Sequence, residues 1–323
     1  MAPEQSRPLE EPDLNDIVVQ AQGLSKRFGS KWAVNALDLE VRRGELFGFL
    51  GPNGAGKSTT LFMMAGLARP TRGSVRLFGR PPSDLRGARS RLGALIEAPA
   101  FVPYLTARKN LELLGRLNGL RRREPIDEAL ERVGLAEAAD QKVGSFSQGM
   151  RQRLGVAQAI QHSPELLILD EPTNGLDPEG GVEIWRLLRE ITASGRATAI
   201  VSSHLLHEIE EHCQRVCVLD RGRAVAQGAV ADLLADQRPA VSLVFPSPEE
   251  AARARAWLER QDWAEVLPSP GGADGPTGIA VRLARAEAAR LNRALHEAGL
   301  APVYLSPLRR TLRDCFLELT SKT

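Results

Sequence analysis

Short apolar runs alternate with longer amphipathic stretches over the first 235 residues of the chain. Uninterrupted apolar runs predict four buried strands, at Leu46–Leu50, Leu166–Leu169, Ala199–Val201 and Val216–Leu219. Two further runs, Ile17–Val19 and Ala36–Val41, also predict strands, and the second alternates apolar and polar residues with period two. Strands that are apolar throughout are typical of a parallel sheet with helices on both faces, so the sequence predicts an α/β fold.

Helices are predicted between these strands. The stretch Lys57–Gly66 follows the first buried strand and predicts a helix. Residues 98–165 are rich in Leu, Arg and Glu with helical spacing, and we interpret them as a helical subdomain inserted between two parts of the sheet. Residues 16–235 are therefore assigned to one large domain.

From residue 236 onward the predicted elements are shorter. Strands are predicted at 241–245, 266–267, 278–283 and 303–305. Helices are predicted at 248–261, 286–298 and 309–319. This order predicts a small accessory α+β domain of the ferredoxin-like type over residues 236–323.

Composition narrows the class of protein. The 323 residues carry a net charge of +2 and include 43% hydrophobic and 25% charged residues, which is ordinary for a globular protein and does not indicate a nucleic-acid-binding face. No apolar stretch approaches the roughly 18 residues of a membrane span, and the acidic, Pro-rich residues 1–15 lack the apolar core of a signal peptide. We expect residues 1–15 to be a disordered tail and the chain to be cytoplasmic. The three cysteines, Cys213, Cys217 and Cys315, are expected to be buried thiols.

A glycine-rich loop follows the strand at 46–50. It fits the phosphate-binding pattern G-x-x-x-x-G-K-[ST] with Gly51, Pro52, Asn53, Gly54, Ala55, Gly56, Lys57 and Ser58, and Thr59 comes next. The glycines allow backbone N–H groups to surround phosphates at the positive end of the following helix. Lys57 is predicted to reach the β- and γ-phosphates, and the Ser58 hydroxyl is predicted to bind Mg²⁺. The loop therefore predicts binding of ATP with Mg²⁺.

A second part of the same site is predicted where the strand at 166–169 ends. Asp170 lies at the carboxyl end of that strand, where α/β sheets bind ligands, and is expected to hold Mg²⁺ directly or through water. Glu171 is expected to orient and deprotonate the attacking water. An Asp-Glu pair after a strand is by itself more typical of a solvated loop, but the phosphate-binding loop favours the functional interpretation.

Two weaker candidates come from other elements. The segment Ser147–Met150 opens a helix, so Ser147 is expected to be an ordinary N-cap, and the same free N–H groups can serve a phosphate. His204 follows the strand at 199–201 and is a candidate contact of the γ-phosphate.

Together these motifs resemble the ATP-binding subunits of ABC transporters, over residues 16–235. The resemblance identifies 51–58 as Walker A, 166–171 as Walker B, 174–177 as the D-loop and Phe146–Met150 as the Leu-Ser-Gly-Gly-Gln signature, of which Ser147 and Gly149 are kept. It implies a P-loop NTPase fold with a RecA-like core sheet and a helical subdomain. It also implies that Asp177 is a D-loop site residue, that His204 is the switch histidine and that Phe28 stacks on adenine. The alternative for Phe28 is a core side chain at a strand end.

The sequence departs from that family at residue 97, where Glu97 replaces the usual Gln. Residues Leu95–Phe101 and the C-terminal segment Leu312–Thr320 resemble the branch of bacitracin, lantibiotic and daunorubicin-type exporters, although Arg313 replaces an acidic residue usual in that branch. The resemblance implies an ATPase that powers export of a drug, antibiotic or amphipathic peptide. It also implies that Glu97 lies at the nucleotide and tunes coupling to the membrane partner.

The same resemblance implies two partners, and the even charge leads us to expect no nucleic acid. One partner is a second ATPase chain, identical or homologous, whose Ser147 and Gly149 close over the nucleotide at Lys57 in a head-to-tail dimer. The other is an integral membrane permease that contacts residues 98–104 and holds the chain at the inner face of the cell membrane. An apolar contact inside the helical subdomain is an equal alternative for residues 98–104. Two other functions stay open: a soluble ABC ATPase acting on nucleic acid or ribosomes, and a subunit that binds ATP without hydrolysing it.

Overall fold

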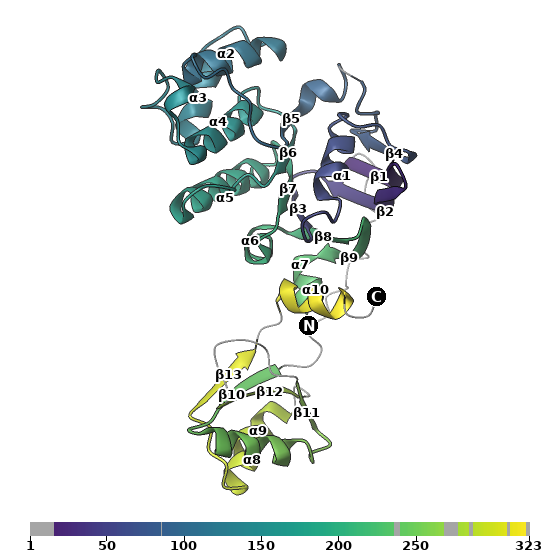
Figure 1. Cartoon of the computed structure of the whole chain (residues 1–323), viewed down its shortest axis with the longest axis vertical. Helices are drawn as coiled ribbons and strands as arrows, with labels where there is room; N and C mark the ends of the chain where they lie inside the picture. Colours follow the sequence, from purple (N-terminus) through teal and green to yellow (C-terminus); the bar gives the residue numbers. More distant parts are fainter. Residues whose placement is uncertain are drawn as a thin grey trace, which may run out of the picture. The chain divides into compact units, whose positions relative to one another are not determined.

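The structure is a computed structural model that describes residues 16–84, 86–235, 240–267, 277–283, 287–308 and 311–320 (Figure 1). The tail predicted at residues 1–15 lies outside these ranges. The chain forms two compact units, one of Met1–Val230 with Leu319–Thr323 and one of Ala231–Glu318. Within the described ranges, no helix combines the length and the apolar character that a bilayer crossing requires.

A six-stranded sheet forms the centre of the first unit, in the order β5-β6-β7-β3-β8-β9. Its strands are β3 (Leu46–Leu50), β5 (Leu92–Leu95), β6 (Leu166–Asp170), β7 (Thr198–Ser203), β8 (Arg215–Asp220) and β9 (Arg223–Ala229). The first five strands in that order pair in parallel, and β9 pairs antiparallel with β8. Every residue of β3 and β7 is buried, which explains the apolar runs Leu46–Leu50 and Ala199–Val201 in the sequence.

A three-stranded antiparallel sheet packs beside the central sheet, in the order β2-β1-β4. Its strands are β1 (Ile17–Phe28), β2 (Lys31–Arg42) and β4 (Arg72–Leu77). One continuous apolar core joins the two sheets and α1 (Lys57–Met64). The sequence predicted only parts of β1 and β2, because polar residues on their outer face interrupt the apolar pattern. It did not predict β4, β5 or β9.

Helices α4 (Gln148–Ile160), α5 (Pro178–Ala193) and α6 (Leu206–His212) pack against the central sheet. The other helices before residue 235 are α2 (Ala107–Leu117), α3 (Glu124–Arg132) and the short α7 (Val230–Leu234), with 3₁₀ turns at Arg89–Arg91 and Val143–Ser145. Thr106 caps α2 and Ser147 caps α4 through their hydroxyl oxygens. Helices α2, α3 and α4 pack on one another, and α4 also packs on β5 and β6. The helix predicted at 57–66 ends earlier, at Met64.

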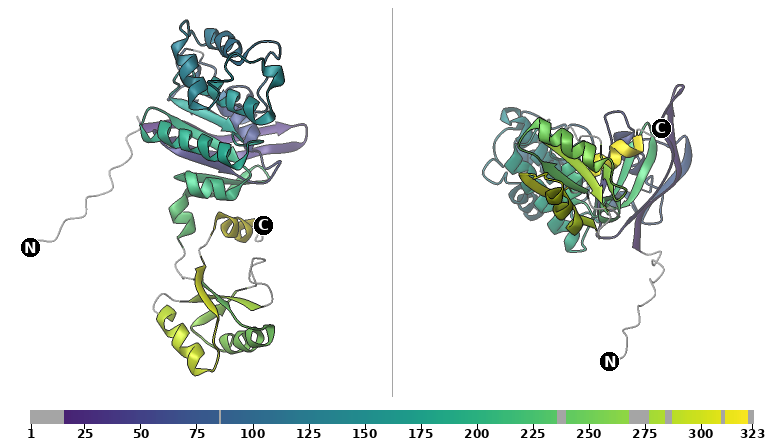
Figure 2. Two further views of the ribbon diagram at one scale, coloured as in Figure 1. Left: turned by 90° about the vertical axis from the view of Figure 1, so that its left-hand side faces the viewer. Right: turned by 90° about the horizontal axis from the view of Figure 1, so that it is seen from below.

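The second unit is a four-stranded antiparallel sheet in the order β11-β12-β10-β13. Its elements are β10 (Ala240–Val244), α8 (Pro248–Leu258), β11 (Ala264–Val266), β12 (Gly278–Leu283), α9 (Ala288–Glu297), β13 (Tyr304–Leu308) and α10 (Leu312–Thr320). Figure 2 shows α8 and α9 on the same face of this sheet, where Leu243, Val281 and Leu291 form part of the core. The order strand-helix-strand-strand-helix-strand is that of a split βαβ layer. The domain limits at residues 235 and 236 stay predictions.

All three cysteines are buried, and none of them forms a disulfide among the residues that the structure describes. Burial raises the pKa of the Cys217 thiol to about 12 and also raises the pKa of Cys213. Because the thiolate is the reactive form, neither thiol is activated, and both act as small apolar core side chains.

Gly93 in β5 provides a test of how α4 docks on the sheet. A Cβ at this position would lie 2.0 Å from the backbone oxygen of Ala159 and 2.8 Å from Cγ of Pro164. We expect Gly93→Ala to destabilise the first unit by about 2 kcal/mol, because α4 has to move away. Gly181 in α5 is the matched control, since its Cβ would meet nothing closer than 4.0 Å. Gly181→Ala should stabilise by roughly 0.5 kcal/mol, and urea unfolding of both variants measures the difference. Equal midpoints would contradict this packing.

Candidate functional site

The loop between β3 and α1 borders an open cavity. Gly56 precedes α1 with a φ of 106°, and a Cβ there would lie 2.4 Å from the carbonyl oxygen of Ala33, so only glycine fits. No side chain caps the first turn of α1. The free N–H groups and the positive end of the helix dipole are therefore available to an anion. This is the arrangement that binds phosphate.

Lys57 supplies the cation of this loop. Its side chain is buried, and Nζ donates hydrogen bonds to the carbonyl oxygens of Gly51 at 2.7 Å and Pro52 at 3.3 Å. Burial lowers the pKa of Lys57, and the nearby carboxylates of Glu171 and Asp170 act in the opposite direction. The ammonium group is thus held by neutral carbonyl oxygens, which a charged phosphate oxygen can replace with a stronger hydrogen bond.

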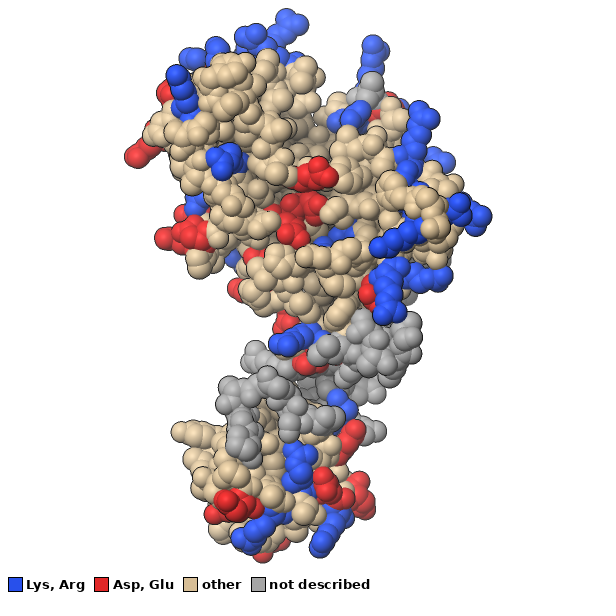
Figure 3. Space-filling view, viewed as in Figure 1, with Lys and Arg blue, Asp and Glu red and all other residues tan. Residues whose placement is uncertain are grey.

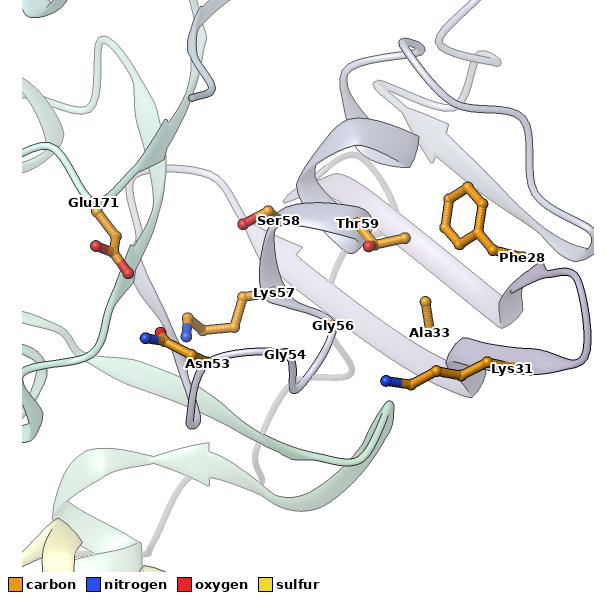
Figure 4. Close-up of a pocket in the computed structure, with 10 residues that line it drawn as sticks. All are labelled: Phe28, Lys31, Ala33, Asn53, Gly54, Gly56, Lys57, Ser58, Thr59 and Glu171. Atoms are coloured by element: carbon orange, nitrogen blue, oxygen red, sulfur yellow. The ribbon is translucent and has the colours of Figure 1, made fainter. Parts of the chain in front are cut away.

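The cavity beside the loop has a volume of about 370 Å³. It is lined by Phe28, Lys31, Ala33, Asn53, Gly54, Gly56, Lys57, Ser58, Thr59 and Glu171. Figure 4 shows Phe28 at one end, Glu171 at the other and Lys57 between them. Phe28 is 59% exposed, so the alternative interpretation as a core side chain is wrong. An aromatic ring at one end and a phosphate loop at the other suit the length of a nucleotide.

Asp170 and Glu171 end β6 on the far side of this cavity. Glu171 has a φ of 47°, a left-handed conformation that is uncommon for a residue other than glycine. Ser202 of β7 holds this turn: the N–H of Glu171 donates to the Ser202 carbonyl oxygen at 3.2 Å and to its Oγ at 3.0 Å. The Ser202 hydroxyl in turn donates to Oδ1 of Asp170. One buried serine therefore positions both carboxylates.

Two further side chains contact Glu171. Gln152 of α4 is buried, and its Nε2 donates to the carbonyl oxygen of Glu171 at 2.9 Å. Nδ1 of His204 lies 3.2 Å from Oε2 of Glu171. Ser203 stabilises the turn that carries His204, because its Oγ accepts from the N–H of Leu205 at 3.0 Å. The backbone of Glu171 is thus held by Gln152 of α4, and its carboxylate lies next to His204, which follows β7.

A second cavity of about 250 Å³ lies next to these carboxylates. Its lining includes Ser58, Glu97, Asp170 and Glu171. A hydroxyl and a carboxylate that share one small cavity are oxygen donors of the kind Mg²⁺ prefers, so these residues fit the predicted ion. Glu97 is exposed and has a φ of 65°.

Ser147, Gly149 and Asp177 line a third cavity of about 390 Å³, which contains no residue of the phosphate loop. The predicted N-cap is present, because Oγ of Ser147 accepts from the N–H of Met150 at 3.1 Å. A Cβ at Gly149 would lie 3.3 Å from the carbonyl oxygen of Gly175, so the loop at 174–177 packs against the start of α4. The predicted site residues therefore fall into two groups within one chain.

Three residues of this site were not predicted from the sequence. Ser202 is a polar residue at the buried end of β7, and Gln152 is a polar residue on the buried side of α4, so both gave a signal that was present in the sequence. Lys31 lines the first cavity, and its amine points into that cavity in Figure 4. No pattern in the sequence marks Lys31.

Gln152 gives a direct test of how Glu171 is positioned. We expect Gln152→Leu to retain ATP affinity and to lower the rate of ATP hydrolysis by roughly 100-fold, because the unpaired carbonyl lets the Glu171 turn move. Steady-state hydrolysis and nucleotide binding measure the two effects separately. Gln161 is the matched control: it is also buried, directly after α4, and its amide has no hydrogen-bond partner in the part of the chain that the structure describes. Gln161→Leu should hydrolyse ATP normally, and an equal loss in both variants would contradict the role of Gln152.

Comparison with known proteins identifies the family and the fold. The family model described as "ABC transporter" matches residues 34–174, which include the phosphate loop, Glu97, the start of α4 and both carboxylates. A solved structure titled as the ATP-binding subunit of an ABC transporter is 30% identical, with a TM-score of 0.62, and covers 67% of this chain and 91% of its own. An ATP-binding cassette solved as a dimer bound to ADP and Pi is 26% identical, with a TM-score of 0.61, and covers 66% of this chain and 98% of its own.

Relatives with curated descriptions extend over most of the chain. The ABC transporter ATP-binding protein YdbJ of Bacillus subtilis (strain 168), itself described as uncharacterized, is 35% identical over 94% of this chain and 96% of its own length. The bacitracin transport ATP-binding protein BcrA of Bacillus licheniformis is 42% identical over 65% of this chain and 69% of its own length. The Nod factor export ATP-binding protein I of Burkholderia lata is 42% identical over 65% of this chain and 70% of its own length. With the phosphate loop, the paired carboxylates and the P-loop fold in place, the chain belongs to the ATP-binding and ATP-hydrolysing subunits of ABC transporters.

Proposed function

We propose that this chain hydrolyses ATP with Mg²⁺ to power export of a drug, an antibiotic or an amphipathic peptide through a separate permease. The observation that carries the proposal is the similarity to BcrA and to the Nod factor export protein, both of which are described as acting in transport or export. The chain would act at the inner face of the cell membrane, attached through the permease. The relatives reported above are all described as ABC transporter, transport or export proteins, so they do not support the alternative of an ATPase that acts on nucleic acid or ribosomes.

The two groups of site residues suggest how a dimer would work. One group, around Lys57, surrounds the phosphate end of the first cavity. The other group, Ser147, Gly149 and Asp177, lines a cavity of its own. We propose that the second group of one chain covers the nucleotide bound by the first group of another. Two helix N-termini, those of α1 and α4, would then share the phosphate charge.

Hydrolysis would depend on the two carboxylates that end β6. Asp170, with Ser58, would hold Mg²⁺, which supplies charge neutralisation on the phosphate oxygens. Glu171 would orient and deprotonate water, and His204, 3.2 Å from its carboxylate, would contact the γ-phosphate. Intact Lys57, Asp170, Glu171 and His204 argue against a subunit that only binds ATP. Phe28 would stack on adenine.

The permease is proposed to contact residues 98–104, directly after Glu97. Tyr104 is 73% exposed and Phe101 is half-buried. Asn110 of α2 fixes the loop, because its Oδ1 accepts from the N–H of Val102 at 2.8 Å and its Nδ2 donates to the Val102 carbonyl at 3.1 Å. A rigid loop with an exposed aromatic ring suits an anchor for a partner helix. Glu97, which lines the cavity beside Glu171, would then report nucleotide binding to this loop.

The variant Glu171→Gln tests the proposed assembly. It should bind ATP without hydrolysing it, so the dimer should persist and stay attached to its permease. A tagged Glu171→Gln chain, captured from native membranes with ATP and Mg²⁺, is expected to bring down a polytopic membrane protein and a second ATPase chain. Glu179→Gln, at an exposed carboxylate in the first turn of α5, serves as the control and should not stabilise the complex. Recovery of ribosomes, nucleic acid or soluble proteins alone would overturn the proposed function.

The contact at residues 98–104 has its own test. The double variant Phe101→Ala/Tyr104→Ala is expected to lower permease-stimulated ATP hydrolysis roughly tenfold, the size of effect expected for an aromatic anchor worth more than 1 kcal/mol. Hydrolysis by the chain without permease should be unchanged. The chain contains one other tyrosine, Tyr304, which is 69% exposed in the second unit, and Tyr304→Ala is the control. Full stimulation of the double variant would show that the permease binds elsewhere.

A further inference from the structure

The outward stripe of α2 carries leucines where a helix on a protein surface normally carries polar side chains. Leu113 is 50% exposed, and Leu117, at 82%, is the most exposed large apolar side chain among the residues described. Lys109 and Arg116 share this stripe, because residues three and four apart lie on one face of a helix. The inward stripe of α2 is buried against the rest of the helical subdomain, so these leucines do not belong to its core.

Basic residues surround the two leucines. Residues 109–123 contain five basic side chains (Lys109, Arg116, Arg121, Arg122, Arg123) and one acidic side chain (Glu112), which gives a net charge of 5 − 1 = +4. Figure 3 shows Lys and Arg atoms gathered along the upper rim of the molecule, over the region where Figure 1 places α2. A cluster of this kind next to exposed leucines is typical of peptide segments that lie on an anionic lipid surface.

Three acidic side chains near the two leucines, Glu112, Asp127 and Asp140, are already paired with basic residues. The next acidic residue along the chain, Glu124, is exposed at the start of α3. Oε1 and Oε2 of Glu112 accept from Arg123 and Lys109, each at 2.9 Å. Arg108 forms ion pairs with the carboxylates of Asp127 and Asp140. Arg116, Arg121 and Arg122 are exposed and make no ion pair within the described ranges. These three guanidinium groups are therefore available to an external anion.

We propose that Leu113, Arg116, Leu117, Arg121 and Arg122, here called the α2 surface, bind the anionic headgroups of a lipid bilayer. In this arrangement the leucines enter the interfacial region and the guanidinium groups contact lipid phosphates. The proposal rests on the proposed function only in placing the chain at a membrane.

The position of the α2 surface agrees with that placement. Asn110 holds the loop at 98–104, the proposed permease contact, on the first half of α2. Leu117 lies seven residues further along the helix, which is roughly 10 Å at 1.5 Å per residue. A chain docked on a permease through this loop would bring the α2 surface close to the headgroups around that permease.

Vesicle binding by the purified full chain tests the proposal without permease or nucleotide. The chain is expected to float with vesicles of phosphatidylcholine and phosphatidylglycerol, not with vesicles of phosphatidylcholine alone, and to be released by high salt. Arg121→Gln/Arg122→Gln should weaken binding to the anionic vesicles roughly 30-fold, the effect of two basic residues at such a surface. Leu117→Gln should weaken it independently of salt, because it removes apolar contact.

A matched control lies on α5, which exposes Val182, Arg186 and Arg189. The triple variant Val182→Gln/Arg186→Gln/Arg189→Gln removes the same kinds of side chain from a helix that also carries Glu179, Glu183 and Glu190. It should bind anionic vesicles as the natural chain does. Absence of binding to anionic vesicles, or equal weakening by the control, would overturn the proposal.

A permease in lipid-free detergent separates the two possible partners. If Leu117→Gln and Arg121→Gln/Arg122→Gln lower stimulation of ATP hydrolysis there, the α2 surface contacts the permease, and the lipid proposal is wrong. Unchanged stimulation in detergent, together with weaker vesicle binding, supports it. The capture experiment with Glu171→Gln does not depend on these residues, so a failure of the transporter assignment would be seen separately.

Discussion

The register of three neighbouring parallel strands determines where every reactive group of the site lies. In the central sheet β3 lies next to β7 and β7 next to β6, with Leu50 opposite Ser203 and Asp170 opposite Ser202. The phosphate loop, the paired carboxylates and the segment carrying His204 therefore leave the sheet at the same edge. A slip of one residue in β6 would turn Asp170 toward the opposite face. The continuous burial of these strands makes such a slip costly, so the apolar core also fixes the positions of the side chains at the site.

Lys57 and the carboxylates of Asp170 and Glu171 lie at the same edge of the central sheet, but each is held by a different partner. Lys57 is held by backbone carbonyls, and its pKa is lowered by burial although Glu171 and Asp170 favour its charged form. Asp170 is occupied by the Ser202 hydroxyl, and Glu171 lies beside His204. Because fixed hydrogen bonds keep the cation and the carboxylates apart, a phosphate group can enter without first breaking an ion pair. That separation is electrostatic preorganisation for binding an anion.

The sequence predicted those parts of the structure whose residue pattern follows directly from burial or from ligand binding. The strands at 46–50 and 166–169 were visible because burial on both faces leaves only apolar residues, and the loop at 51–58 was visible because phosphate binding requires its glycines. Strand β4 was not predicted, since four of its six residues are partly or fully exposed and give no apolar run. The sequence shows Gln152 as a polar residue on the buried side of α4, but it does not show its partner, which is a backbone carbonyl brought close by tertiary packing. A hydrogen bond between α4 and the end of β6 has no counterpart in local sequence.

The same hydrogen bond links the two halves of the site. Helix α4 carries Ser147 at its first turn and Gln152 at its second, so the residue proposed to meet a partner's nucleotide and the residue that holds Glu171 belong to one rigid element. Movement of α4 when a dimer closes would displace the Gln152 amide and, through it, the left-handed turn of Glu171. The strain stored at that turn, of the order of 1 kcal/mol for a non-glycine residue, makes it sensitive to loss of this single contact. In the proposed dimer, closure over nucleotide and alignment of the carboxylate would therefore be one mechanical event rather than two.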